Sequence, residues 1–245
     1  EQAALFGVKK TFPSLDELCR SDCDCIALFT QRWKHAPQAV QALKAGKHVY
    51  SAVPAAATLE QLDELVKTVE ETGLIYMLAE TSYYRAQTTF CRQKFAAGAF
   101  GKFVYGEGQY HHDMAHFYEA YYRANGDDWK RAASYPPMLY PTHSTAFLIA
   151  VTGERLLKVS CIGTGDKNEP ALKDNQYNNP FQNGMAMFLT DKGNPFRCNV
   201  GWDIEGHGER AEWFGSQGAF YMAGPAKQPC IYRSDGRTYT HEPDY

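Results

Sequence analysis

The sequence predicts the α/β fold class, with a doubly wound parallel sheet followed by an α+β domain built on a large, mostly antiparallel, open-faced sheet. Three observations support this prediction. Short apolar runs alternate with helical periodicity in residues 1–84, and longer strands of alternating polarity follow from about Gly101. The composition is that of an ordinary globular protein, with 44% hydrophobic and 22% charged residues among 245. We therefore expect two domains, residues 1–84 and residues 85–245.

The charge balance argues against two classes of partner. The formal net charge is -3, so no excess of Lys and Arg is available to neutralise phosphates, and we expect neither nucleic acid nor a membrane surface as partner. No apolar run reaches the roughly 20 residues that a bilayer demands, and no charged-then-apolar leader opens the chain. We expect a soluble protein and leave the compartment open between cytoplasm and periplasm.

The seven cysteines are odd in number and scattered along the chain, which favours reduced thiols over a disulfide framework. Cys23 and Cys25 are one residue apart and so lack the two-residue gap of zinc-binding pairs. Because Cys25 begins an apolar strand, we expect it to be a buried structural cysteine.

The first helix is predicted by a cap and the first strand by an apolar run. Ser14-Leu-Asp-Glu17 is a capping box for a helix that runs to about Cys19. The stretch Cys25-Ile-Ala-Leu-Phe-Thr30 is continuously apolar and has strand length, which is typical of a parallel strand buried on both faces. Pro37 then fits the first turn of a helix that Gly46 ends.

Two more strands and a helix complete the first domain. Residues 48–51 and 74–79 are the strands, and Thr58 caps the helix between them, which Gly73 ends. The inward-facing residues of this helix recur at helical spacing: Leu62, Leu65, Val66 and Val69. Strands and helices that alternate with short connections predict a Rossmann-like, doubly wound sheet.

Ligands of such sheets bind beyond the carboxyl ends of the strands. These ends carry the residues from which we expect cofactor contacts: Thr30, Gln31, His35, Ala52, Val53, Pro54 and Glu80. Two of them have a structural alternative, because His35 could cap the following helix and Glu80 could hydrogen bond to a loop.

The glycine-rich, phosphate-binding turn of a nucleotide-binding domain is missing, since no G-x-G-x-x-G occurs in the sequence. Residues 1–12 resemble the tail of a helix and the approach to a third strand. We therefore expect that the first strand, turn and helix of the domain are not part of this sequence.

The second domain is predicted from five strands separated by turns such as Asp191-Lys-Gly193 and Ser216-Gln-Gly218. The strands are residues 102–110, 156–163, 183–190, 195–203 and 211–214. Their alternating polarity favours an antiparallel sheet with one open face.

Two motifs in this domain carry titratable aromatic residues. The stretch Glu107-Gly-Gln-Tyr-His-His-Asp-Met114 ends the first strand, and alternation places Tyr110 and His112 on one face and His111 and Asp113 on the other. The stretch Tyr135-Pro-Pro-Met-Leu-Tyr-Pro-Thr-His-Ser144 leads into an apolar run at residues 146–151, which we expect to be helical. A helix start disfavours a positive charge, so His143 there would stay neutral and could accept a proton near pH 7.

Other interpretations of these residues compete with catalysis. With 8 His and 16 Tyr, clusters of the two also arise as hydrogen-bonded core. A zinc site of His111, His112, Asp113 and His143 is disfavoured, because adjacent residues of a regular strand cannot both face one ion, and we expect no metal. We interpret His207 as a turn residue, and Ser144 lacks the acid and histidine partners of a serine nucleophile.

Two stretches resemble the Gfo/Idh/MocA oxidoreductases, which are nicotinamide-dependent enzymes of sugars and related polyols. Ala45-Gly-Lys-His-Val-Tyr-Ser-Ala-Val-Pro54 is similar to that family's A-G-K-H-V-x-x-E-K-P, and Thr30-Gln-Arg-Trp-Lys-His35 stands in place of T-P-N-x-x-H. The family's lysine is catalytic and orients the substrate, whereas this sequence has Val53 in its place and Ala52 in place of the glutamate.

The branch known as glycoside hydrolase family 109 also has a valine before the proline. It resembles this chain at Glu107-Gly-Gln-Tyr-His-His-Asp113 and at Leu139-Tyr-Pro-Thr-His143, and it uses a tyrosine and a histidine from each motif. The resemblance implies that the catalytic residues are Tyr110, His112, Tyr140 and His143, brought together beside the nicotinamide. We expect His111, Asp113 and Tyr84 to contact the substrate, and His111 stands where an apolar or aromatic residue is usual.

The mechanism that the resemblance implies is redox-assisted cleavage of a glycoside. NAD takes a hydride from C3 of the sugar, a base removes the acidified C2 proton, the C1 substituent leaves, water adds and the hydride returns. His143 would assist at the C3 hydroxyl or hold the enolate oxygen, Tyr110 and His112 would be the C2 base and its orienter, and Tyr140 would donate a hydrogen bond. NADP in place of NAD remains open.

Two other functions remain open: a plain sugar or polyol dehydrogenase, and a sugar-binding relative without catalysis. The partner would be a small carbohydrate. The family commonly uses the open sheet to form oligomers, and aromatic residues on its strands would suit such an interface, so we expect a homodimer or homotetramer. The sequence ends at Tyr245, before the family's usual closing segment, so we expect the second domain to be incomplete as well.

Overall fold

The computed structural model describes residues 2–223, 230–234 and 237–241. The chain divides into two compact units, residues 1–79 and residues 80–245, where we expected the boundary after Tyr84. The boundary lies earlier because the short helix η2 (Thr81–Tyr84) packs against helix α8 (Thr142–Thr152) of the second unit.

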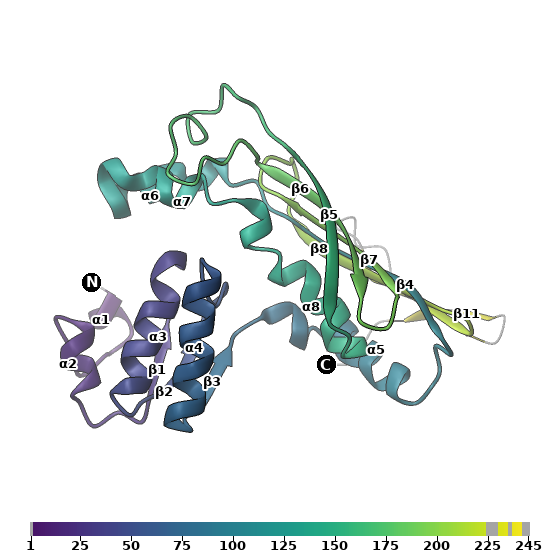
Figure 1. The fold of residues 1–245 in the computed structure, drawn as a ribbon, viewed down its shortest axis with the longest axis horizontal. Coiled ribbons are helices and arrows are strands. Elements are labelled where there is room, and N and C mark those ends of the chain that lie inside the picture. The colour runs from purple at the N-terminus through teal and green to yellow at the C-terminus, as the bar shows by residue number, and fades with distance from the viewer. Residues whose placement is uncertain (1, 224–229, 235–236, 242–245) are drawn as a thin grey trace. The chain divides into compact units, whose positions relative to one another are not determined.

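The first unit carries a three-stranded parallel sheet in the order β1-β2-β3, which confirms the predicted Rossmann-like architecture. Helices α3 and α4 connect its strands and lie against one face of the sheet (Figure 1). The elements of this unit are α1 (Gln2–Leu5), α2 (Leu15–Cys19), β1 (Cys25–Leu28), η1 (Arg32–Lys34), α3 (His35–Lys44), β2 (His48–Ser51), α4 (Leu59–Thr72) and β3 (Tyr76–Leu78).

The predicted helix caps account for where α2 and α4 begin and end. The side-chain oxygen of Ser14 accepts the amide N–H of Glu17 at 3.2 Å, and Thr58 caps α4 in the same way through the amide of Gln61 at 3.2 Å. Gly73 ends α4 with a φ of 64°, a left-handed conformation that glycine adopts without steric cost.

The prediction that β1 is buried on both faces is wrong. Residues of β1 alternate between exposed and buried, and Phe29, just beyond the strand, is 70% exposed. In the described residues α3 and α4 cover a single face, so the register row Ala27, Tyr50 and Met77 lies on the side that neither helix covers. Cys25 is exposed for the same reason, contrary to our expectation that it is buried.

The helical stripe of α4 is also covered only in part. Leu65 is buried and Val69 packs at the edge of the core, but Leu62 is 39% and Val66 50% exposed. The sheet below is only three strands wide, which is too narrow to cover the whole apolar stripe.

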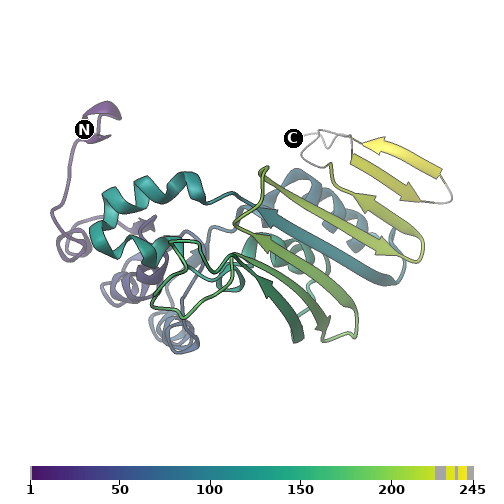
Figure 2. The same cartoon turned by 90° about the horizontal axis from the view of Figure 1, so that it is seen from above.

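The second unit is built on an eight-stranded sheet in the order β11-β10-β9-β8-β4-β7-β6-β5. It is mostly antiparallel, as predicted, and contains one parallel pair, β4 with β7. Figure 2 views this sheet from the face that no helix of the described residues covers. The strands are β4 (Phe103–His111), β5 (Leu156–Thr164), β6 (Asn183–Thr190), β7 (Pro195–Gly201), β8 (Gly208–Gly215), β9 (Gly218–Tyr221), β10 (Cys230–Ser234) and β11 (Arg237–His241).

Several elements of this unit were not predicted. Strands β9, β10 and β11 are only four or five residues long. The unpredicted helical segments are α5 (Ala86–Ala96), η3 (Ala115–Phe117), α6 (Tyr118–Asn125), η4 (Gly126–Trp129), α7 (Lys130–Ala133) and η5 (Pro137–Leu139). Helix α8 was predicted but begins four residues before the expected apolar run.

Helix α8 packs closely on β4 because that strand has a glycine where the two meet. A Cβ atom on Gly108 would lie 2.4 Å from the carbonyl oxygen of Ser144, so any side chain there would push the helix away. The hydroxyl of Ser144 donates a hydrogen bond to the carbonyl of Asn199 in β7 at 2.9 Å. Phe147, on the same helix, is fully buried in the core of the unit. The start of α8 is thereby held against the two central strands.

Within the described residues, no helix combines the length and the apolar character needed to cross a membrane.

Candidate active site

His143 lies in the first turn of α8 and is held by a buried carboxylate. Its Nδ1 atom is 2.8 Å from Oε1 of Glu80, and the two residues are 8% and 6% exposed. An ionised carboxylate only accepts hydrogen bonds, so the ring proton belongs on Nδ1. Glu80 thereby selects the tautomer of His143 that leaves a lone pair on Nε2 when the ring is neutral.

The lone pair on Nε2 of His143 faces a hydroxyl group. The Tyr140 hydroxyl, from the loop before α8, lies 3.2 Å from this nitrogen. Glu80, His143 and Tyr140 therefore form a continuous hydrogen-bond series. A proton can pass between the tyrosine oxygen and the imidazole, while the carboxylate stabilises the positive charge that the ring would gain.

Tyr110 and His112 form a second tyrosine and histidine pair at the end of β4. The Tyr110 hydroxyl is 2.8 Å from Nδ1 of His112, and the two rings meet edge to face with centroids 5.8 Å apart. Tyr110 is 9% exposed, whereas His112 is half-buried. The pair can exchange a proton in the same manner as the first.

The structure brings both pairs into one cluster. The ring centroids of Tyr110 and His143 are 4.6 Å apart, and those of Tyr110 and Tyr140 are 6.4 Å apart. Trp202, which follows β7, packs edge-on to Tyr110 at 5.8 Å and lies 5.6 Å from Tyr140. The roles predicted for the four residues stay predictions, but the distances allow them to act on one small molecule.

Three residues near this cluster were missed or assigned to other roles. Trp202 was not singled out, and His207, interpreted as a turn residue, lies with its ring centroid 4.3 Å from that of His112. Glu80 was expected at the cofactor, with hydrogen bonding to a loop as the alternative. The structure shows that alternative, because Glu80 also accepts the amide N–H of Ser82 at 2.9 Å, and adds the contact with His143.

The charge of Glu80 is stabilised in spite of its burial. Burial alone would raise the pKa of Glu80, but the hydrogen bond and charge of His143, together with the Ser82 amide, outweigh burial and lower the pKa below its ordinary value of 4.5. Glu80 is therefore ionised at neutral pH, and in that form it accepts the hydrogen bond from Nδ1 of His143.

The three residues predicted to bind substrate come from the end of β4, the turn after it and η2. His111 faces away from Tyr110 on β4 and lies near Arg210, and burial together with the Arg210 charge lowers its pKa. Asp113 accepts the amide N–H of Ala115 at 2.9 Å and so caps the turn that follows β4. Tyr84 is 57% exposed and packs against Tyr83. Contact of these three residues with a substrate stays a prediction.

In the first unit, one histidine ties together two of the loops predicted to bind cofactor. The ring of His35 lies 3.0 Å from the carbonyl oxygen of Thr30 through Nε2 and 2.9 Å from that of Pro54 through Nδ1, and it is 1% exposed. Both ring nitrogens face backbone oxygens inside the unit, and contact of His35 with the cofactor stays a prediction.

The other predicted cofactor residues lie on those loops. Thr30 is exposed, with its hydroxyl bonded to Gln38 at 2.6 Å, and Gln31 and Ala52 are half-buried. Val53 is 7% exposed, and the Val53–Pro54 peptide bond is cis. Contact with the cofactor stays a prediction for all of them.

No three His, Cys, Asp or Glu side chains in the part of the chain that the structure describes are arranged to hold a metal ion. The absence of a metal stays a prediction.

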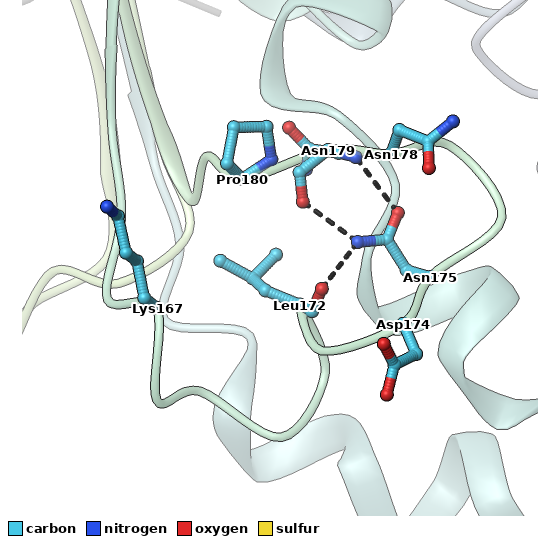
Figure 3. Close-up of a pocket in the computed structure, with 7 residues that line it drawn as sticks. All are labelled: Lys167, Leu172, Asp174, Asn175, Asn178, Asn179 and Pro180. Atoms are coloured by element: carbon cyan, nitrogen blue, oxygen red, sulfur yellow. Dashed lines mark hydrogen bonds between the residues drawn. The ribbon is translucent and has the colours of Figure 1, made fainter.

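A depression of about 310 Å³ lies in the second unit, and none of the four rings is among its lining residues. Figure 3 shows the hydrogen bonds of Asn175 in its wall: the side-chain amide donates to the carbonyls of Leu172 at 2.6 Å and Asn179 at 2.8 Å, and the side-chain oxygen accepts the backbone amide of Asn179 at 3.1 Å. The asparagines thus serve the loop itself. The lining residues are Lys167, Leu172, Asp174, Asn175, Asn178, Asn179 and Pro180.

The fold and the cluster define the class of protein, and comparison with known proteins agrees. Residues 1–80 match the GFO_IDH_MocA family model, described as an oxidoreductase family with an NAD-binding Rossmann fold. The chain is 35% identical over 180 residues, 71% of its length, to "Glycosyl hydrolase family 109 protein 2" of Shewanella sp. (strain ANA-3). It is 29% identical over 203 residues, 79% of its length, to a glycosyl hydrolase family 109 protein of Porphyromonas gingivalis (strain ATCC BAA-308 / W83).

Solved structures show the same fold. An NAD binding oxidoreductase from Klebsiella pneumoniae superposes with a TM-score of 0.79 at 18% identity, covering 97% of this chain and 66% of the other. An inositol dehydrogenase homolog from Azotobacter vinelandii, solved with NADH and myo-inositol, gives 0.73 at 15% identity, covering 93% and 59%. The comparisons confirm that this chain is of the Gfo/Idh/MocA type, with family 109 proteins among its relatives. It spans 39% and 42% of the length of the two curated relatives.

Proposed function

We propose that this chain is part of a nicotinamide-dependent enzyme that acts on a sugar or glycoside through a 3-keto intermediate and removes the C2 proton to cleave the glycosidic bond. The observation that carries the proposal is the pair of hydrogen-bonded tyrosine and histidine couples in one cluster, with Glu80 behind His143. The names of the family 109 relatives support a glycoside as substrate, and the match of residues 1–80 supports NAD as cofactor.

The residues of the first unit fit a nicotinamide nucleotide in part. His35 hydrogen bonds to two loops that follow the carboxyl ends of the adjacent parallel strands β1 and β2. Parallel sheets of this kind bind nucleotides at this edge. Thr30, Gln31, Ala52, Val53 and Pro54 would hold the cofactor there. When bound, the nicotinamide supplies reversible hydride transfer at a carbon of the substrate.

In this proposal, His143 and Tyr140 move the proton of the substrate's C3 hydroxyl. As C3 is oxidised, the proton of its hydroxyl passes to Nε2 of His143, directly or through the Tyr140 oxygen 3.2 Å away. Glu80 holds Nδ1 and stabilises the imidazolium. The same groups return the proton to the oxygen when C3 is reduced at the end.

In the same proposal, Tyr110 and His112 act at C2. The C3 ketone makes the C2 proton acidic. One member of the pair removes this proton as the base, and the other member orients the base. The C1 substituent then leaves with its bonding electrons and takes up a proton. Water adds at C1 and C2 regains a proton. The net reaction is hydrolysis of the glycoside, with no net change in the cofactor.

The test is an assay of the intact protein with nitrophenyl glycosides and with free sugars and inositols, each with NAD and with NADP. Release of nitrophenol without net formation of reduced cofactor supports redox-assisted cleavage. Stoichiometric formation of reduced cofactor would instead assign a plain dehydrogenase. Binding without turnover would assign a non-catalytic sugar-binding protein, in line with Val53 in place of a lysine.

We further propose that the uncovered face of the eight-stranded sheet forms a homo-oligomer interface. Apolar side chains on neighbouring strands of this face are exposed: Ile162 by 70%, Met185 by 48%, Met187 by 45% and Leu189 by 39%. Next to them lie charges paired within the face, such as Glu107 with Arg197. An apolar strip beside satisfied charges is typical of a protein interface.

A further inference from the structure

The carboxylate of Glu209, at the start of β8, is held by donors from η2 and from the residue that follows it. Arg85 donates to it through two nitrogens, from Nη2 to Oε1 at 2.7 Å and from Nε to Oε2 at 3.3 Å. The hydroxyl of Ser82 also donates to Oε2, at 2.8 Å. The Glu209 side chain is only 11% exposed. A forked arginine contact with a third donor is one of the stronger arrangements available to a carboxylate.

Ser82 connects this carboxylate to the candidate site. Its hydroxyl is bound by Glu209, while its backbone amide donates to Oε1 of Glu80 at 2.9 Å. The hydroxyl of Thr88 donates to the Ser82 carbonyl at 2.9 Å, which ties the same residue to α5. Ser82 is fully buried, so its position is set by these contacts.

The same Glu80 oxygen that accepts from Ser82 also accepts from His143. A continuous hydrogen-bond series therefore runs from Glu209 through Ser82 and Glu80 to the imidazole. In the sheet, Glu209 is the cross-strand partner of Tyr110. Glu209 on β8 is therefore next to the second tyrosine and histidine pair and is connected to the first pair through Ser82 and Glu80.

We propose that Glu209 is a positioning residue for His143, which fixes η2 through Ser82 and so holds Glu80 on Nδ1 of the imidazole. The catalytic meaning of this role rests on the proposed function, but the positioning itself does not. Glu209 would neither touch the substrate nor exchange a proton. Its charge matters because it binds Arg85 and Ser82 at once, and no neutral side chain of that size accepts from both equally well.

The positioning is tested by NMR of the protein labelled with ¹⁵N in its histidines, without substrate. In the parent protein we expect a low-field Nδ1–H resonance from His143, assigned by its loss in His143→Gln. In Glu209→Ala we expect this resonance to shift upfield or vanish through exchange. Glu209→Gln keeps an acceptor for the Ser82 hydroxyl, so the resonance should change less than in the alanine variant. This second variant tests the proposal even if Glu209→Ala does not fold.

The matched control is Glu107→Gln. Glu107 has a 12% exposed side chain, pairs with an arginine and accepts a tyrosine hydroxyl, yet it lies on the other face of the sheet. Its loss should leave the His143 resonance in place. If Glu209→Ala and Glu209→Gln fold and also leave it unchanged, the proposal is overturned.

Kinetics give a second readout once a substrate is identified. Glu209→Ala should lower kcat about 10-fold to 100-fold with KM within about twofold, because the substrate contacts remain. The acidic limb of the kcat profile should move to higher pH, since Glu80 loses the held Ser82 amide that stabilises its charge. His143 is the titratable residue bonded to Glu80, and Arg85 and Glu209 lie beyond Ser82. Parental kcat and an unmoved limb would contradict the proposal, whereas absence of turnover in the parent would contradict the proposed function alone.

Discussion

At the residue scale, the tyrosine of the second pair can be tested with its ring left in place. Tyr110→Phe removes the hydroxyl that bonds His112 but keeps the ring that packs on His143 and Trp202. If Tyr110 takes part in proton transfer at C2, kcat should fall by about 10²-fold to 10⁴-fold while the melting temperature changes little. Steady-state kinetics and thermal unfolding measure the two quantities.

Tyr135→Phe is the matched control for that variant. Tyr135 is a buried tyrosine of the same unit, and its ring packs on Tyr177. It should keep parental kcat. Equal losses in both variants would mean that Tyr110 acts through packing alone.

Glu80 provides a prediction about stability and pH. The pKa of Glu80 is lowered in the folded protein. Its ionised form therefore stabilises the fold at pH values above the ordinary pKa of 4.5, and this contribution is lost as the pH falls through the pKa of the folded state. Glu80→Gln should therefore be less stable than the parent at pH 7, and the difference should shrink below pH 4. Urea unfolding at both pH values measures it, and a difference independent of pH would contradict the assignment.

At this scale, motif residues were predictable from sequence but their supports were not. Tyr110, His112, Tyr140 and His143 stand in two short motifs that the sequence shows directly. Trp202, His207 and Glu209 reach the same place only because β7 and β8 flank β4 in the sheet. Strand pairing between residues 90 to 112 positions apart leaves no local signal, so these residues could not be found from spacing.

At the element scale, the close contact between β4 and α8 can be tested at a single glycine. Gly108→Ala would place a methyl group 2.4 Å from the Ser144 carbonyl oxygen, a backbone atom that can yield only if α8 moves. We expect a loss of about 1–3 kcal/mol in the free energy of unfolding, and reduced kcat because His143 moves with the helix. Chemical denaturation and kinetics test the two effects.

The neighbouring Gly106→Ala variant is the control. Its methyl group would meet side-chain atoms of Phe103 and Phe196 at 3.0 Å and 3.1 Å, which leaves α8 in place. It should reduce stability with little effect on kcat at saturating substrate. Equal effects on kcat in both variants would show that the contact with α8 has no special role.

Elements with local signals were predicted closely, and those without were not. Helix α4 and strand β6 match their expected ranges, because a cap, a glycine stop or clear alternation marks their ends. Strands β9 to β11 are too short to establish a period, and α5 has no clear apolar stripe. The burial of β1 was mispredicted, because an apolar run alone does not show how many of its faces are covered.

At the scale of the whole molecule, the proposed oligomer predicts an effect of charge on one face of the sheet. Met187→Lys introduces a cation among exposed apolar side chains and beside its cross-strand partner Arg197. If this face is the interface, the variant should shift toward monomer in sedimentation velocity, since an unpaired charge in an interface core is costly.

Val159→Lys is the control for that experiment. Val159 is 60% exposed on the edge strand β5, but its side chain faces the opposite side of the sheet from Met187. It should leave the sedimentation coefficient of the parent unchanged. An unaltered assembly in Met187→Lys would place the interface elsewhere.

The parallel pairing of β4 with β7 has a consequence for the order in which the molecule forms during synthesis. A nascent chain that has emerged only as far as residue 180 contains all four candidate catalytic rings, yet the strands that flank β4 on both sides are still to be made. Contacts this distant in sequence form late. The four candidate catalytic residues are therefore synthesised well before the strands that align them, so we expect their cluster to form only after β8 has been translated.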